Sequence, residues 1–367
     1  MKKNIVVNAT SATVGGSLTI LNQFIENICD DSDKDKIYYV FVPITSDLKS
    51  CDNIIIVPIR AKKYVDRIKW DLIGMRKWFQ KSGIKPDLII SLQNTAVLFG
   101  KVKQIIYLHQ PLIYAKESSW SILKKDERKM WFYRYIYKVW VKSSIKKDHY
   151  IVVQTEWMKE SVIKSGYSKD KIIISKPKMN YVDIDEVKPL DNENKKYLFY
   201  PAADYKYKNH MILIKAIRNI VENNDFIKEK YKIVFTLEKD SIVYKHVIEY
   251  GLEDYFEFVG VLPYQKVLSY YKGCQAVLFP SYIETFGLPL IEASVFGKKI
   301  LVSDCEYSRE VLNGYDMAEF IKYDDSMSWS KAIIENLKPY CEETKIDFNE
   351  NGYEKVFKLI DSIIYEY

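Results

Sequence analysis

Short runs of β-branched and aromatic residues alternate with helical patterns along the first half of this 367-residue chain, and this alternation restricts its fold most strongly. The runs that predict strands are residues 5–7, 38–42, 54–57, 88–91, 105–108 and 150–153. Between the third and fourth runs, apolar residues at spacings of three and four predict an amphipathic helix; they are Val65, Ile68, Leu72, Met75 and Phe79. This alternation is typical of a mostly parallel, doubly wound α/β sheet.

A second series of strands follows a polar stretch, residues 183–196, which we interpret as a linker. The later strand-like runs are 197–200, 232–236, 256–259, 276–279 and 299–302, and each precedes a helix or a turn. They predict a second Rossmann-type domain, and a chain of this length exceeds what one hydrophobic core usually serves. We therefore predict an N-terminal domain over residues 1–185, a C-terminal domain over 186–348 and a final amphipathic helix over 349–367.

The composition is that of an ordinary globular protein, with 48% hydrophobic and 28% charged residues, which gives no reason to expect disorder. The five cysteines show no C-x-x-C pairing, and their odd number argues against a disulfide framework; they are Cys29, Cys51, Cys274, Cys305 and Cys341. A reducing cytoplasm fits this pattern best. The first apolar run, residues 5–7, is far too short for a signal peptide or a membrane span.

The segment with the most chemical information is E-T-F-G-L-P at residues 284–289, just after the apolar run 276–279. Pro289 at the predicted first helical position, with Gly287 just before it, indicates a strand–loop–helix junction, because proline is favoured at that position. A helix N-terminus offers N–H groups and a positive dipole end to an anion, and glycine lets a phosphate approach the backbone. Glu284 in the loop and Glu292 near the end of the first helical turn are predicted to face one site.

Two glutamates separated by seven residues around F-G-L-P resemble the E-x7-E signature of retaining glycosyltransferases with the GT-B fold, the family 4 type also called glycosyl transferases group 1. The resemblance covers essentially the whole chain, including the glycine pair Gly15 and Gly16 and the later S-R-E-V at residues 308–311. It implies two Rossmann-like domains with a cleft between them, and a C-terminal helix that crosses back to the N-terminal domain. It also implies transfer of a sugar from a nucleotide-sugar co-substrate, with no cofactor and no metal ion.

The resemblance also assigns roles to the residues of the motif. Glu284 would lie beside the transferred sugar and favour positive charge at its anomeric carbon, and Glu292 would accept hydrogen bonds from the ribose hydroxyls. The backbone amides of Phe286, Gly287 and Leu288 would contact the sugar and the distal phosphate. Taken alone, Glu292 is equally well explained as a favourable partner of the helix dipole.

A second group of candidate residues, Lys206 and Lys208, lies in the loop after the run 197–200. A lysine there would neutralise the leaving diphosphate as a compact cation. In related enzymes an arginine five residues before the lysine shares this work, but Ala203 stands at that position. Lys206 is the candidate replacement, and a solvated basic turn is the alternative interpretation of the loop.

Three further candidates lie in the N-terminal half. In the family, the loop with Gly15 and Gly16 approaches the donor diphosphate and the acceptor, although a glycine pair alone usually marks only a tight turn. His109 matches the position where related enzymes place a histidine near the sugar. A single histidine is as often structural, so both interpretations of His109 stay open.

The net charge is +6, but basic residues gather in the N-terminal half: residues 62–85 and 116–147 carry +6 and +7, and the rest of the chain carries about −7. In the second segment, four basic residues at spacings of four predict a basic stripe along one helical face; they are Arg134, Lys138, Lys142 and Lys146. Rings that would lie at a membrane interface are Trp120, Trp131, Phe132, Tyr133, Tyr135, Tyr137 and Trp140. An anionic membrane surface is the expected partner, a solvated face with a buried aromatic side is the alternative, and no nucleic-acid motif accompanies the charge.

Two acidic patterns resemble metal sites but fit them poorly. Asp183 and Asp185 form a D-x-D that falls in the linker rather than after a strand, and residues 31–35 begin like a calcium loop in which Lys36 replaces the required glycine. Both are interpreted as solvated turns.

The sequence thus predicts a cytoplasmic enzyme at the inner face of the plasma membrane. It would transfer sugar from a UDP-, GDP- or dTDP-sugar to a glycan or lipid-linked saccharide, in the synthesis of capsule, O-antigen or cell-wall glycan. The alternatives are a nucleotide-sugar epimerase of the same fold, which would need no acceptor, and a catalytically silent subunit that binds nucleotide-sugar.

Overall fold

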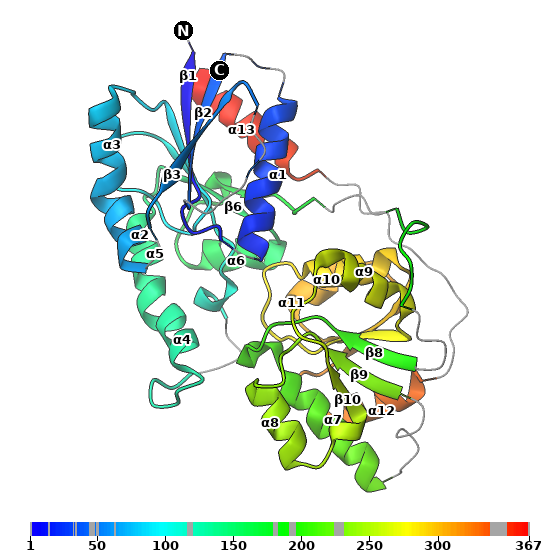
Figure 1. Ribbon diagram of the computed structural model, residues 1–367. Helices are drawn as coiled ribbons and strands as arrows, with labels where there is room; N and C mark the ends of the chain where they lie inside the picture. The colour runs from blue at the N-terminus through cyan, green and yellow to red at the C-terminus, as the bar shows by residue number, and fades with distance from the viewer. Residues whose placement is uncertain are drawn as a thin grey trace. The chain divides into compact units, whose positions relative to one another are not determined.

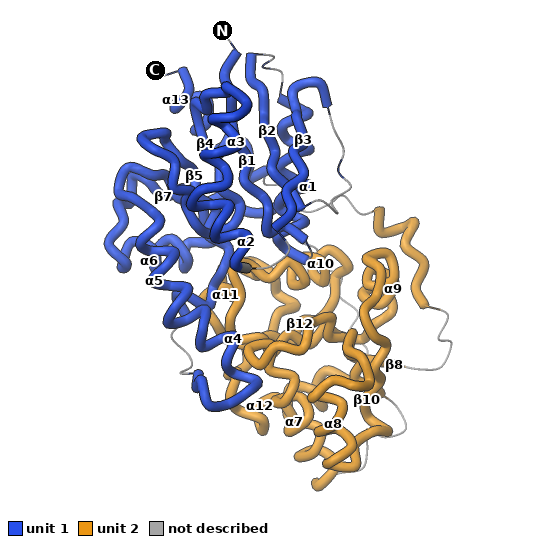
Figure 2. Tube along the Cα trace, turned by 60° about the vertical axis from the view of Figure 1, so that its left-hand side comes forward, with its two compact units in different colours: residues 1–178, 350–367 blue, residues 179–349 orange. Residues whose placement is uncertain are grey.

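The computed structural model describes residues 2–13, 15–31, 33, 35–43, 48, 51–61, 64–115, 120–178, 183–190, 196–223, 231–337 and 351–365. The chain forms two compact units, Met1–Lys178 with Glu350–Tyr367 as unit 1 and Met179–Asn349 as unit 2 (Figure 2). Each unit contains its own parallel sheet with helices packed on it (Figure 1). The predicted fold class, two doubly wound α/β domains, is confirmed.

Unit 1 has a seven-stranded sheet in the order β3-β2-β1-β4-β5-β6-β7. Its strands are β1 (Lys3–Asn8), β2 (Lys36–Pro43), β3 (Ile54–Ile59), β4 (Leu88–Ser91), β5 (Gln104–Tyr107), β6 (Tyr150–Val153) and β7 (Ile172–Ile174). Its α-helices are α1 (Gly16–Asp30), α2 (Tyr64–Lys69), α3 (Met75–Ser82), α4 (Arg128–Trp131), α5 (Lys138–Ser144), α6 (Glu156–Lys164) and α13 (Tyr353–Tyr365). Shorter turns are η1 (Trp70–Gly74) and η3 (Phe132–Tyr137), both π-helical, and the 3₁₀ turns η2 (Pro111–Ile113) and η4 (Lys169–Lys171).

Side chains of the unit 1 strands alternate between two faces, so each face has a separate core. On one face, Val7 packs with Phe24 of α1 and Ile360 of α13. On the other face, Val6 packs with Phe79 of α3. Figure 1 shows α1 and α13 together on one side of the sheet and α3 on the opposite side. The C-terminal helix therefore belongs to the core of the N-terminal unit.

The predicted amphipathic helix over residues 65–79 is interrupted by the π-helical turn η1. Met75 and Phe79 are buried as predicted, but Val65 is 56% exposed. The wider π turn changes the rotation per residue, so the spacing of an uninterrupted helix does not carry across it. Asp71, inside the turn, is buried instead.

Unit 2 has a six-stranded sheet in the order β10-β9-β8-β11-β12-β13. Its strands are β8 (Lys196–Tyr200), β9 (Tyr231–Phe235), β10 (Phe256–Phe258), β11 (Ala276–Phe279), β12 (Lys299–Ser303) and β13 (Ala318–Ile321). Its helices and 3₁₀ turns are η5 (Lys206–Lys208), α7 (His210–Asn223), α8 (Ile242–Glu249), η7 (Glu253–Tyr255), α9 (Tyr264–Gly273), α10 (Leu288–Val295), α11 (Glu306–Val311) and α12 (Ser326–Glu335). The strand order reverses between β8 and β11, which is the topological switch point of this sheet.

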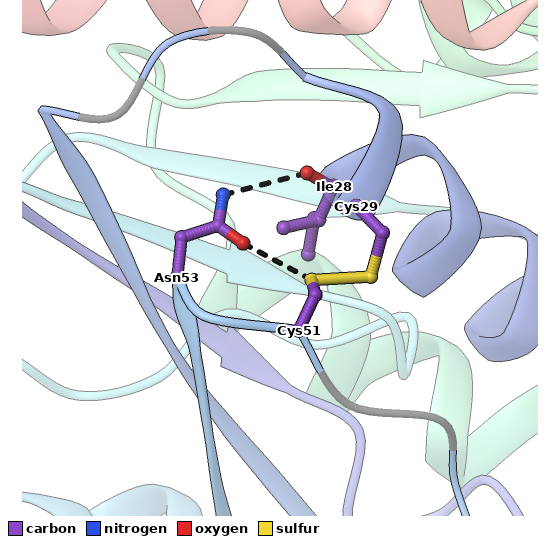
Figure 3. Close-up of a disulfide and its surroundings, with 4 residues drawn as sticks. All are labelled: Ile28, Cys29, Cys51 and Asn53. Atoms are coloured by element: carbon purple, nitrogen blue, oxygen red, sulfur yellow. Dashed lines mark hydrogen bonds between the residues drawn. A yellow bond between two sulfur atoms is a disulfide. The ribbon is translucent and has the colours of Figure 1, made fainter.

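A disulfide joins Cys29 of α1 to Cys51 just before β3, with a Cα–Cα distance of 5.8 Å (Figure 3). The expectation that the cysteines form no disulfide was therefore wrong. The packing of α1 beside the β2–β3 pair brings together two residues 22 positions apart, which spacing alone could not show. Cys274 and Cys305 are free thiols, and Cys341 lies outside the described residues.

Lys36 of β2 holds the C-terminal helix through a cluster of charges in which the lysine is buried and the carboxylates are partly exposed. Its ammonium lies 2.8 Å from Asp31, 3.4 Å from Asp33 and 2.6 Å from Asp361 of α13. Burial alone would lower the pKa of Lys36, but the hydrogen bonds and charges of Asp31 and Asp361 outweigh burial and raise this pKa above its ordinary value. The cation beside the apparent calcium loop is thus the chain's own lysine, and the backbone N–H groups of Asp33 and Asp35 donate to Asp31 Oδ1 and Asp33 Oδ1 as in a turn.

Candidate functional site

Lys208 and Glu284 form an ion pair at the switch point of the unit 2 sheet. Lys208 ends the turn η5 after β8, and Glu284 lies in the loop after β11, the strand that pairs with β8. Only 16% and 14% of their side chains are exposed, so solvent screens the pair weakly. Ligands of open α/β sheets bind at the carboxyl ends of the strands at such a switch point.

The carboxylate of Glu284 is oriented by a buried serine. Ser281 is fully buried, and its hydroxyl donates to Glu284 Oε1 at 2.8 Å. The backbone oxygen of Ser281 in turn accepts from the Tyr307 hydroxyl at 2.6 Å. Ser281 and Tyr307 were not among the sequence candidates, since nothing in their spacing marks them.

Asn209 holds the loop of Lys208 against two other loops of the same sheet edge. Its φ of 62° is left-handed, a conformation that asparagine tolerates better than most residues. Its Nδ2 donates to the backbone oxygens of Pro280 and Tyr323, at 3.2 Å and 2.8 Å. Asn209 was also missed, although an asparagine between a turn and a helix is a usable signal for this conformation.

Glu292 lies on α10 in a less charged environment than Glu284. Its Oε2 accepts from the Tyr271 hydroxyl at 3.2 Å, and Tyr264 is a second hydrogen-bond partner. Burial raises the pKa of Glu292 above its ordinary value, and the two tyrosines offset this only in part. Because α10 begins at Leu288, Glu292 lies beyond the first helical turn. The helix dipole acts mainly within that turn, so it explains the position of Glu292 less well than the sequence suggested.

The loop before α10 leads into the helix through a left-handed glycine. Gly287 has φ 90°, and a Cβ at this position would lie 3.3 Å from Leu290 Cδ1, so glycine is needed for both backbone and space. Gly287 is the N-cap of α10 and has no side chain to cap the helix. Phe286 is buried behind the loop, and Leu288 is the first residue of α10.

The remaining candidates of this half lie in the turn η5. Lys206 is exposed in the same turn as Lys208, and Ala203 is exposed in the loop before it. Lys206 is thus accessible, and its proposed phosphate role stays a prediction.

Gly15, Gly16 and His109 lie in unit 1. Gly15 is the N-cap of α1 with φ 62°, and no heavy atom lies within 4 Å of a Cβ built on Gly15 or Gly16. His109 follows β5; its backbone N–H donates to Asn94 Oδ1 at 2.7 Å, and its Nε2 lies 3.4 Å from Asn94 Nδ2. Burial lowers the pKa of His109 to about 4, so the ring is neutral at neutral pH.

A polar network that the sequence did not reveal lies at the switch point of the unit 1 sheet, between β1 and β4. Asp71 Oδ1 accepts from Asn8 Nδ2 at 2.9 Å and from Gln93 Nε2 at 2.7 Å, and Oδ2 accepts from the Thr95 hydroxyl at 3.2 Å. These donors are neutral. Burial raises the pKa of Asp71 to about 7, and the hydrogen bonds offset this only in part.

We expect the replacement of Asp71 with asparagine to reduce the dependence of stability on pH. The folded pKa lies above the unfolded value of 3.8, so stability linked to Asp71 is present at low pH and is lost as the pH rises toward 7. Asparagine has no such titration and can still accept at Oδ1 and donate to Thr95. In urea unfolding, the wild type should lose about 3 kcal/mol relative to the variant between pH 5 and pH 8, because about two pKa units of the shift lie in that window and one unit represents ~1.4 kcal/mol. A difference independent of pH would contradict this account.

The basic segment departs from the predicted stripe in two ways. The π-helical turn η3 interrupts the helix and α5 ends at Ser144, so Lys146 lies outside it. Lys138 stays close to Arg134 and Lys142. Burial, and the positive charges of these two residues, lower the pKa of Lys138. Among the predicted interfacial rings, Trp120 and Tyr137 are buried, Tyr135 is exposed and the others are partly buried. The large apolar residues exposed in this segment are Ile122, Leu123, Tyr135, Ile136 and Val139.

Among the residues that the structure describes, no three histidine, cysteine or carboxylate side chains gather as a metal site would require. Asp183 accepts from the backbone N–H of Asp185 at 3.1 Å, which is a local turn. No helix in the described ranges combines the length and apolar character needed to span a bilayer.

Comparisons with known proteins find that this chain is similar to glycosyltransferases. Residues 182–355 match the family model described as glycosyl transferases group 1. The O-antigen chain mannosyltransferase RfbU of Salmonella typhimurium is 24% identical over 247 residues, which are 65% of each chain. An N,N'-diacetylbacillosaminyl-diphospho-undecaprenol α-1,3-N-acetylgalactosaminyltransferase of Campylobacter jejuni is 25% identical over 63% of this chain and 65% of its own length.

Solved structures show the same architecture. A sucrose-phosphate synthase from Thermosynechococcus elongatus has a TM-score of 0.67 at 14% identity, over 100% of this chain and 97% of its own. The two parallel-sheet units thus have the GT-B fold. Residues 182–355 of this chain are similar to the glycosyl transferases group 1 family.

Proposed function

We propose that this protein is a retaining glycosyltransferase that moves a sugar from a UDP-, GDP- or dTDP-sugar to a glycan or lipid-linked acceptor. The observation that carries the proposal is the Lys208–Glu284 pair at the switch point of the sheet in the region that matches the family. The relatives named above act on O-antigen and on a diphospho-undecaprenol-linked sugar, which supports cell-surface polysaccharide as the product class. Free sugar formed without an acceptor would indicate the epimerase alternative instead.

In the proposed reaction, the bond between the anomeric carbon and the diphosphate oxygen breaks, and its electron pair leaves with the diphosphate. The acceptor oxygen forms the new bond to this carbon, and its proton passes to the leaving diphosphate. Lys208 offsets the charge of the diphosphate, and Glu284 favours the positive charge that develops on the sugar. Glu292 binds the ribose, and the N-terminus of α10 contacts the sugar and the distal phosphate.

The test of this assignment is the replacement of Lys208 with alanine. Loss of the cation should weaken nucleoside-diphosphate binding and turnover strongly, and it should leave the weaker binding of the nucleoside unchanged. Calorimetry with the diphosphate and the nucleoside of the best donor measures the two effects separately. Lys206→Ala is the companion variant, and a smaller defect there would show that Lys206 shares the work of the missing arginine at Ala203. Diphosphate binding at the wild-type level in Lys208→Ala would reject the assignment.

We also propose that residues 120–144 attach the protein to the inner, anionic face of the plasma membrane. Ile122 and Leu123 are 49% and 85% exposed, and Lys124, Lys125 and Arg128 beside them are exposed too. Further along, Ile136 and Val139 are 50% and 65% exposed beside the cluster of basic residues. Exposed apolar residues among cations suit a surface of anionic lipid.

Liposome binding should therefore require anionic lipid and decline with salt, because exposed charges are screened beyond about 10 Å at ~0.1 M ionic strength. Charge reversal of Arg134, Lys138 and Lys142 to glutamate should abolish binding and leave activity on a soluble acceptor. A matched control reverses three exposed lysines of unit 2, Lys239, Lys322 and Lys331, and should keep binding. Co-sedimentation measures both, and equal binding to neutral vesicles would contradict the electrostatic account.

A further inference from the structure

The cation that we assign to the donor diphosphate already has an anionic partner within unit 2. Lys208 Nζ is ion-paired with Glu284 Oε1, and the same oxygen accepts from Ser281 Oγ at 2.8 Å. The ammonium also lies 5.7 Å from the ring centre of Tyr207 and 5.8 Å from that of Phe279. Glu284 and two aromatic rings thus surround the ammonium of Lys208.

A diphosphate cannot bind Lys208 without affecting this pair. A phosphate oxygen in contact with the ammonium would lie close to the carboxylate of Glu284, and like charges in a weakly solvated site repel strongly. The carboxylate must then leave Lys208 or give up part of the interaction. Ser281 would still tether Glu284 near the reacting sugar after such an exchange.

We propose that Glu284 occupies the phosphate position on Lys208, so that the donor binds by exchanging its diphosphate for this carboxylate. This inference rests on the function proposed above and adds a second role for Glu284. The exchange releases the carboxylate toward the sugar only when a diphosphate is present. The site thereby favours ligands with a phosphate that reaches Lys208 over nucleosides and over free sugars.

The proposal makes an unusual prediction for nucleoside diphosphates, which lack the sugar. A glutamate that only contacts the sugar would not change their affinity when it is replaced, and a glutamate that only supports the fold would weaken binding. If Glu284 competes for Lys208, its replacement with glutamine should tighten binding by about tenfold, the effect expected for one hydrogen bond to a charged group. Glu284→Ala should tighten binding as well, because it also removes the competing charge.

The experiment is calorimetric titration of the full chain with UDP, GDP and dTDP and with their nucleosides. The variants are Glu284→Gln, Glu284→Ala, Lys208→Ala and the Lys208→Ala/Glu284→Gln pair, with Glu253→Gln as an exposed control in unit 2. We expect both Glu284 variants to bind the diphosphate more tightly, and most of that gain to disappear when Lys208 is absent.

The outcomes separate this inference from the proposed function. If the wild type binds a diphosphate through Lys208 but the Glu284 variants bind it equally or less well, the exchange is wrong and the transferase assignment stands. A gain of equal size without Lys208 would also overturn the exchange, because it would reflect simple repulsion by Glu284. If the wild type binds no nucleoside diphosphate, the proposed function fails, and the exchange fails with it.

Discussion

Replacement of Glu284 with glutamine should lower kcat by about 100-fold or more, the range observed when one group that stabilises transition-state charge is removed. The expected effect is on kcat because the interaction with the anomeric carbon strengthens as positive charge develops. The replacement is nearly isosteric, and Ser281 can still donate to the amide oxygen, so the fold should persist. Initial rates with saturating acceptor and a varied donor measure the effect.

Glu292→Gln is the informative comparison. The carboxylate of Glu292 lies beside Tyr271 and Tyr264, apart from the ion pair. Because this carboxylate is proposed to bind the ribose, we expect the Glu292→Gln variant to have a higher donor KM and a nearly unchanged kcat. Glu253→Gln, on the surface of the same unit, should change neither constant. If both site variants stay folded with wild-type kinetics, the two assigned roles are wrong.

Replacement of Lys36 with methionine should destabilise unit 1 by about 2 kcal/mol, between the values for exposed and for buried ion pairs, because Lys36 is buried while its carboxylate partners are partly exposed. The Lys36 side chain is 2% exposed, and removal of its ammonium leaves Asp31, Asp33 and Asp361 near one another without that cation. Because Asp361 lies on α13, we expect the C-terminal helix to detach first. Urea unfolding measures the loss, and hydrogen exchange along residues 353–365 locates it.

Lys358→Met is the matched control, because Lys358 lies on the same helix and pairs with Glu354 on the surface, where both side chains are mostly exposed. Exposed pairs contribute little, so this variant should unfold like the wild type. Equal losses for the two lysines would contradict the assigned role of the Lys36 cluster.

The regular elements of both sheets could be predicted from the sequence, because buried parallel strands form continuous apolar runs. Strands β7 and β13 were missed: β7 has only three residues, and three of the four residues of β13 are only half-buried. The π-helical turns were missed as well, because no residue type marks them. The π-helical turn η1 changes which side chains face the interior, and it places Asp71 there, where an uninterrupted helix would place apolar residues.

The site was partly predictable for a similar reason. The motif around Glu284 and Lys208 could be recognised because each follows a strand, but their pairing depends on the adjacency of β8 and β11 across the sheet. The spacing of residues along the chain does not show which strands are neighbours in the sheet. The same holds for Asn209, whose contacts join three loops, and for Cys29 and Cys51, which only the packing of α1 brings together.

The central claim is transfer of sugar through the Lys208–Glu284 site, and the most direct test follows a radiolabelled sugar. UDP-, GDP- and dTDP-sugars would be incubated with bacterial membrane lipids and the purified wild type, Glu284→Gln or Glu253→Gln protein. The account predicts that label from one donor enters the lipid-linked fraction with equimolar release of nucleoside diphosphate, and that only Glu284→Gln abolishes both. Label recovered solely as free sugar, or equal transfer by the wild type and Glu284→Gln, would contradict it.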